Sequence, residues 1–182
     1  MVEHVGRGQY LAPRSAAKEQ FFWEGQRNVA PRPISLWLEP IITVAGLARL
    51  HFEFGWPKHL IGAQSKDWAF DIATYQQLDS ANEFVACEVK KTASELEGLV
   101  RTMRQLATDD VRSETSMSKG QINAYRKLNA LRTRRAPFFW ALGPGGAGYV
   151  FRMSYGEDGV VMFSAACEDD LRYGDDRAAD AG

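Results

Sequence analysis

Two neighbouring runs of alternating residues constrain the fold of this chain more than any other part of its sequence. They are WAFDIATYQ, residues 68–76, and EFVACEVKK, residues 83–91. Strand side chains alternate between two faces, and the short polar connection between the runs predicts an antiparallel hairpin. Centring the hairpin between Asp79 and Ser80 makes one face almost wholly apolar. The pairs on that face are Phe70 with Val89, Ile72 with Cys87, and Thr74 with Val85.

The opposite face of the same hairpin carries charged residues among small ones. Its pairs are Ala69 with Lys90, Asp71 with Glu88, Ala73 with Ala86, and Tyr75 with Phe84. Directly opposed residues have Cβ atoms about 4.5–5.5 Å apart. Two carboxylates so placed repel each other unless a cation lies between them or one is protonated. Asp71, Glu88 and Lys90 therefore predict a site for a hard cation and a phosphodiester. The competing interpretation is an ordinary ion pair on a solvated sheet face.

Helices and further strands are predicted on both sides of this hairpin. Helices are expected at 16–29, from Pro40 through 54, from a capping box at Thr92–Glu95 through 107, and at 118–134. Strands are expected at 59–64 and 138–142, with a C-terminal hairpin made of 149–155 and 160–166. In the 118–134 helix the inward residues are expected to be Ile122, Tyr125, Leu128 and Leu131, with Lys119, Arg126, Lys127 and Arg132 on its other faces. The order predicts an α/β protein.

Length and composition favour one domain with a buried hydrophobic core. The chain has 182 residues, of which 45% are hydrophobic. We expect a single domain over 1–167 and an acidic, disordered tail over 168–182. Two cysteines give no disulfide framework, and no apolar stretch is long enough to span a bilayer. No signal peptide is visible at the N-terminus, so we expect a cytoplasmic protein without a membrane partner.

The order of these elements resembles the PD-(D/E)XK nuclease superfamily, which has the restriction-endonuclease-like fold. The resemblance lies in FDIATY, which contains Asp71, and in CEVK, which contains Glu88 and Lys90. The pair Gln121-x-x-x-Tyr125 is similar to a motif of RecB-like members. The whole resemblance covers about residues 39–155. Phe70 stands where many members of the superfamily have proline. The resemblance implies a central mixed sheet flanked by helices, followed by the C-terminal hairpin.

The resemblance also implies roles for individual residues. Asp71 and Glu88 would ligate Mg²⁺ or Mn²⁺, with the backbone carbonyl of Val89 as a third ligand and Glu39 as a further candidate. Lys90 would orient a water molecule or stabilise the transition state, and Gln121 would contact DNA or hold the water network. Two purely structural interpretations stay open. Ser118 and Gln121 also fit a helix capping box, and Glu39 also fits an acid that suits the start of a helix.

Net charge is −1, but the basic residues are concentrated in one region. Residues 101–135 hold nine Lys and Arg against three acids, an asymmetry that suggests polyanion binding. The candidate nucleic-acid contacts are Lys119, Tyr125, Arg126, Lys127, Arg132, Arg134 and Arg135. We therefore expect a metal-dependent nuclease that hydrolyses phosphodiester bonds in DNA. The alternative is a catalytically inactive nuclease-fold module that binds nucleic acid or a protein partner.

Overall fold

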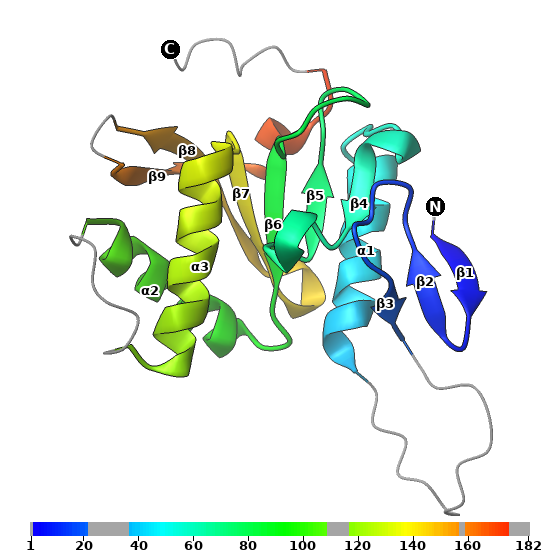
Figure 1. The fold of residues 1–182 in the computed structure, drawn as a ribbon, viewed down its shortest axis with the longest axis horizontal. Helices are drawn as coiled ribbons and strands as arrows, with labels where there is room; N and C mark the ends of the chain where they lie inside the picture. The colour runs from blue at the N-terminus through cyan, green and yellow to red at the C-terminus, as the bar shows by residue number, and fades with distance from the viewer. Residues whose placement is uncertain (1, 22–36, 109–116, 157–158, 175–182) are drawn as a thin grey trace, which may run out of the picture.

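A mixed β-sheet between helices organises the protein (Figure 1). The computed structural model describes residues 2–21, 37–108, 117–156 and 159–174. Within those residues the larger sheet has six strands in the order β4-β5-β6-β7-β8-β9, and the β6–β7 pair alone is parallel. The strands are β4 (Ile61–Ala63), β5 (Ile72–Thr74), β6 (Val85–Val89), β7 (Phe138–Leu142), β8 (Gly148–Tyr155) and β9 (Val161–Ala166). The predicted α/β class with a central mixed sheet and a C-terminal hairpin is confirmed.

The predicted β5–β6 register is confirmed. Ile72 pairs with Cys87, Ala73 with Ala86, and Thr74 with Val85. Ile72 and Cys87 pack on the side of α1 (Leu38–Phe52), whereas Ala86 packs on the side of α2 (Ala93–Thr108) and α3 (Lys119–Arg134). The placement of Phe70 on the apolar face with Val89 was wrong. Regular alternation begins only at Ile72, so Phe70 turns the other way and packs near Phe139, on the α2–α3 side.

The helix α1 lies against the strands β4 to β6 and is held very close to the sheet. Gly46 is the point of closest approach. A Cβ built there would lie 2.6 Å from the Ile72 side chain and 2.7 Å from that of Leu142. Glycine therefore lets the helix backbone approach the sheet at this position. The helix starts at Leu38, two residues before the start that Pro40 predicted.

On the opposite face, α2 and α3 pack together over the sheet (Figure 1). The hydroxyl of Thr92 accepts a hydrogen bond from the Glu95 N–H, as a helix cap. The predicted apolar stripe of α2 is buried and consists of Leu96, Leu99, Val100, Met103 and Ala107. The inward residues of α3 differ from the prediction: they are Ala124, Lys127, Leu128 and Leu131. Lys127 therefore lies inside the protein and not on a solvated face, because its position fits the inward i, i+3, i+4, i+7 spacing.

The N-terminal residues form a small antiparallel sheet beside the main one. It consists of β1 (Glu3–Gly6), β2 (Gln9–Leu11) and β3 (Glu19–Gln20). The helix predicted over 16–29 is wrong over 16–21, where no residue is helical and Glu19 and Gln20 pair with β2. The remainder of that prediction, from residue 22 on, lies outside the described residues.

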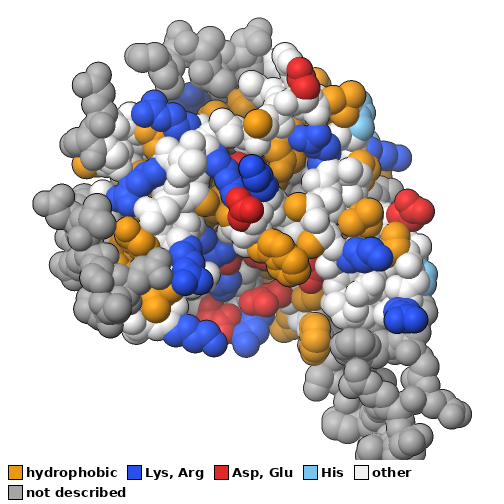
Figure 2. Space-filling view, in the orientation of Figure 1, with side chains coloured by type: hydrophobic (Ala, Val, Ile, Leu, Met, Phe, Trp, Pro, Cys, Tyr) orange, Lys and Arg blue, Asp and Glu red, His pale blue; other side chains and the backbone are white. Residues whose placement is uncertain are grey.

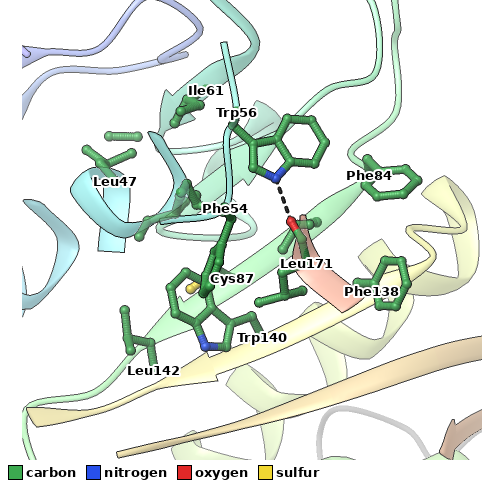
Figure 3. Packing of buried hydrophobic residues seen from close by; sticks show 14 of the residues in the cluster. Leu47, Phe54, Trp56, Ile61, Phe84, Cys87, Phe138, Trp140, Leu142 and Leu171 are labelled. Carbon is green, nitrogen blue, oxygen red and sulfur yellow. Dashed lines mark hydrogen bonds between the residues drawn. The ribbon is translucent and has the colours of Figure 1, made fainter. Parts of the chain in front are cut away.

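The start of the acidic C-terminal segment belongs to the core. Leu171 is fully buried, and its carbonyl accepts a hydrogen bond of 2.6 Å from the indole of Trp56 (Figure 3). Arg49 of α1 forms a two-pronged ion pair with Glu168. The expected disorder is therefore wrong for residues 168–174, while 175–182 lie outside the described residues. No helix in the described ranges is long and apolar enough to cross a bilayer.

Candidate functional site

Two carboxylates meet where β5 begins and β6 ends. Asp71 immediately precedes β5, and its Oδ2 accepts a hydrogen bond of 2.8 Å from the backbone N–H of Val89. Glu88 lies on β6, and only 2% of it is exposed. Asp71 lies just before the β5–β6 ladder, and its bond to Val89 brings its carboxylate close enough to Glu88 for the two charges to interact. A buried carboxylate needs charged or hydrogen-bonding partners, so the groups around Glu88 define the site.

Two lysines hold the two oxygens of Glu88. Lys90 Nζ lies 2.5 Å from Oε1, and Lys127 Nζ lies 2.5 Å from Oε2. Lys90 also donates to the Val89 carbonyl at 3.0 Å, and Lys127 donates to the Ala69 carbonyl at 2.9 Å. The carboxylate is thus clamped between a strand residue and a helix residue. Sequence reasoning missed this role of Lys127, which only its place on the inward stripe of α3 signals.

The charges around the site change the titration of its members. Burial and the negative charge of Glu88 raise the pKa of Asp71 to about 7, while Lys127 and the Val89 N–H act in the opposite direction. Burial lowers the pKa of Lys90, but the adjacent Glu88 carboxylate outweighs burial and leaves that pKa raised. Lys90 is therefore a cation at neutral pH. Asp71 takes up or releases a proton in the neutral range.

Two adjoining clefts open beside this cluster, and Glu39 from the first turn of α1 lines both. The larger has a volume of about 800 Å³, and its lining includes Lys90, Gly98, Lys119, Gly120 and Asn123. The smaller has a volume of about 530 Å³, and its lining includes Trp37, Thr43, Gln64, Asp71 and Lys91. Figure 2 shows acidic and basic side chains gathered near the lower centre of this face. The cluster is therefore accessible from solvent through its edges, Asp71 and Lys90.

The site contains oxygen atoms of the kind that hard cations bind. Mg²⁺ prefers oxygen ligands and is commonly held by one or two carboxylates with several waters. Asp71 and Glu88 supply carboxylates. The Lys90 ammonium donates both to Glu88 and to the Val89 carbonyl, so these two oxygen atoms face one positive charge. Among the described residues, no group of three or more His, Cys, Asp or Glu side chains is placed to hold a metal ion. The fit therefore rests on two carboxylates and a carbonyl.

The remaining predicted residues on α3 take different places. Gln121 completes the capping box with Ser118: its side-chain oxygen accepts from the Ser118 N–H at 2.9 Å. The competing capping interpretation of Gln121 thus describes its contacts in the structure. Lys119 lines the larger cleft, and Tyr125 is half-buried against the α2–α3 core. Arg126 is exposed on the outer side of the helix.

The arginines near the end of α3 are largely engaged with the protein itself. Arg134 is ion-paired with the buried carboxylate of Glu83 at 2.7 Å and donates to the Lys66 carbonyl at 2.8 Å. Arg132 donates to the Gly159 carbonyl and to Asn129. Arg135 ends the helix in a left-handed conformation, with its guanidinium over the Tyr155 ring. Of the basic residues predicted to contact nucleic acid, Lys127 is ion-paired with Glu88 and Lys119 lines the same cleft as Lys90.

Searches against protein-family models, curated proteins and solved structures find no match to this chain.

Proposed function

We propose that this protein is a metal-dependent nuclease of the PD-(D/E)XK type, which hydrolyses phosphodiester bonds in DNA with Mg²⁺ or Mn²⁺. One observation supports the proposal: Asp71 bonds to the Val89 N–H, Lys90 is ion-paired with Glu88, and Lys90 lines the larger cleft. This is the arrangement that the resemblance to the superfamily implies. The restriction-endonuclease-like topology, with a mixed sheet between helices, is part of the same proposal.

Each residue of the site has a chemical task in this proposal. Asp71, Glu88 and the Val89 carbonyl would hold the ion. A bound divalent metal lowers the pKa of its water and offsets charge on the scissile phosphate. Lys90 carries its positive charge at the edge of the larger cleft, where it would stabilise charge that develops on the phosphate oxygens. Lys127 holds the second oxygen of Glu88 and so fixes the orientation of that carboxylate.

Plasmid nicking with Mg²⁺ or Mn²⁺ tests the proposal. We expect Asp71→Asn, Glu88→Gln and Lys90→Met each to lower the rate at least about 100-fold, since each removes a group from the reacting site. Lys58→Met, an exposed lysine on another face, is the matched control and should cleave at the wild-type rate. Circular dichroism checks that each variant is folded. Cleavage that survives all three site substitutions contradicts the proposal.

The second candidate is a catalytically inactive module on the same fold that binds nucleic acid or a protein. A specific observation favours it: both oxygens of Glu88 already accept hydrogen bonds from ammonium groups, which neutralise the carboxylate without a metal. This candidate predicts DNA binding that weakens steeply with salt, with no cleavage in Mg²⁺ or Mn²⁺. A protein-binding module would lack even that salt-dependent DNA binding.

A further inference from the structure

Two clefts share Glu39 as a lining residue, and together we call them the trough. Trp37 lines the smaller cleft, which is the Trp37 end, and Lys119 lines the larger cleft, which is the Lys119 end. We propose that the trough binds a single strand of nucleic acid, with phosphates at the Lys119 end and an unpaired base on Trp37. This inference rests on the proposed function and names its substrate class.

The Lys119 end of the trough is kept open by two glycines inside helices. A Cβ built at Gly98 on α2 or at Gly120 on α3 would meet no atom within 4 Å, so packing does not require glycine at either position. Glycine is unfavourable in a helix interior, where Gly98 lies, whereas Gly120 is in the first turn of α3. Neither residue places a side chain in the cleft that both line. Lys90, Lys119 and Asn123 line that space and offer the donors that phosphate oxygens accept.

Acidic side chains also line the trough and limit where phosphates can lie. Glu39 is shared by both clefts, and Glu95 lines the larger one. Glu95 is paired with Lys91 at 3.5 Å, which offsets its charge. The smaller cleft contains Asp71, Glu39 and Glu19, so its charge disfavours a phosphate without a metal. A neutral base is a better occupant there.

The other end of the trough offers an aromatic surface for that base. Trp37 precedes α1, is 52% exposed, and lines the same cleft as Asp71. Bases stack on exposed aromatic side chains in proteins that bind single strands, whatever the base. A base that stacks on protein has left its own stack, so the occupant is unpaired or extruded from a duplex. A single strand satisfies both ends of the trough without the cost of opening a duplex.

The first experiment fills the Lys119 end. Binding of the full-length protein to a fluorescent 12-nucleotide poly-dT strand is measured by anisotropy in EDTA, where cleavage does not occur. We expect Gly98→Leu and Gly120→Leu to weaken binding at least tenfold, because leucine is a good helix former that occupies the open space. Gly98→Ala and Gly120→Ala are the matched controls and should stay within twofold of wild type. Unchanged affinity in both leucine variants overturns the proposal.

The second experiment tests the aromatic end with the same strand. Trp37→Ala should weaken binding about tenfold, while Trp37→Phe should stay within threefold because it keeps a ring for stacking. Trp68→Ala is the control: Trp68 is 72% exposed and does not line either cleft, so affinity should not change. Equal losses for Trp37→Ala and Trp37→Phe would show that the indole does not act as a stacking surface, and would overturn this part of the assignment.

A duplex of the same length separates this inference from the proposed function. We expect wild-type protein to bind the single strand at least tenfold more tightly than the duplex. If that preference and the variant effects hold but no metal cleaves the strand, the nuclease proposal fails while the trough stands. If metal-dependent cleavage occurs but the duplex binds equally well and the leucine variants are neutral, the trough fails while the nuclease proposal stands.

Discussion

The ammonium of Lys127 lies 2.5 Å from Glu88 Oε2, and both residues are buried. This contact joins α3 to the central strand β6. The same ammonium donates to the Ala69 carbonyl and lies 5.8 Å from the centre of the Phe70 ring. Lys127 therefore connects three parts of the chain that are distant in sequence. The candidate site and the packing of α3 depend on the same side chain.

Replacing Lys127 by methionine should destabilise the protein by about 3 kcal/mol, because a buried carboxylate then loses one of its two cations. Chemical denaturation followed by circular dichroism measures the loss. Lys119→Met, at an exposed lysine of the same helix, is the control and should change stability by less than about 0.5 kcal/mol. Adding Glu88→Gln to Lys127→Met should recover part of the loss. A double variant less stable than Lys127→Met would contradict this account.

Asp71 should make stability depend on pH in the neutral range. Its pKa in the folded protein, about 7, is above the ordinary value of 3.8, so the folded state holds the proton more tightly than the unfolded chain. The resulting stability is fully present below pH 4 and is lost as pH rises through 7. Asp71 is half-buried, so solvent screening reduces the effect. From pH 5 to pH 8 the free energy of unfolding of Asp71→Asn should rise by about 2 kcal/mol relative to that of wild type.

Denaturation of both proteins at the two pH values measures this gain. Asp79→Asn, an exposed acid in the β5–β6 connection, controls for the substitution itself and should alter stability little at either pH. A stability difference between wild type and Asp71→Asn that is the same at pH 5 and pH 8 would show that the Asp71 carboxyl does not titrate as described.

Arg134 should matter for folding more than for contact with a polyanion. Its guanidinium pairs with Glu83, which is 2% exposed, and also contacts Ser65 and Lys66. We expect Arg134→Met to lower the free energy of unfolding by about 3 kcal/mol, since it leaves the Glu83 carboxylate buried without its cation. Arg126→Met, on the exposed side of the same helix, should cost less than about 0.5 kcal/mol. Equal unfolding midpoints for the two variants would refute the structural role.

The parts of the fold that the sequence predicted are those with a strong local signal. The β5–β6 pairing follows from two-residue alternation and a symmetric hairpin, and the strand β7 follows from an apolar run between Pro137 and Gly143. Asp71, Glu88 and Lys90 became candidates because the predicted hairpin register would place them together. Their geometry is local to one hairpin.

The parts that were missed depend on contacts distant in sequence. The burial of Lys127 requires Glu88, which lies 39 residues earlier. The fixed position of Leu171 requires its hydrogen bond with Trp56, which lies 115 residues earlier. The short strand β3 owes its conformation to β2, although its own residues favour a helix. Charge clustering alone predicted surface roles for Lys127 and Arg134, whereas a partner carboxylate inside the protein draws each inward.

The position of a bound metal tests the central proposal most directly. Crystals grown with Mn²⁺ and measured at the manganese absorption edge would locate the ion from its anomalous scattering. The nuclease account predicts a peak in contact with the Asp71 and Glu88 carboxylates and the Val89 carbonyl, with Lys90 Nζ moved away from Glu88 Oε1. Crystals with no peak at that place at millimolar Mn²⁺, and with both ammonium groups still on Glu88, would contradict it.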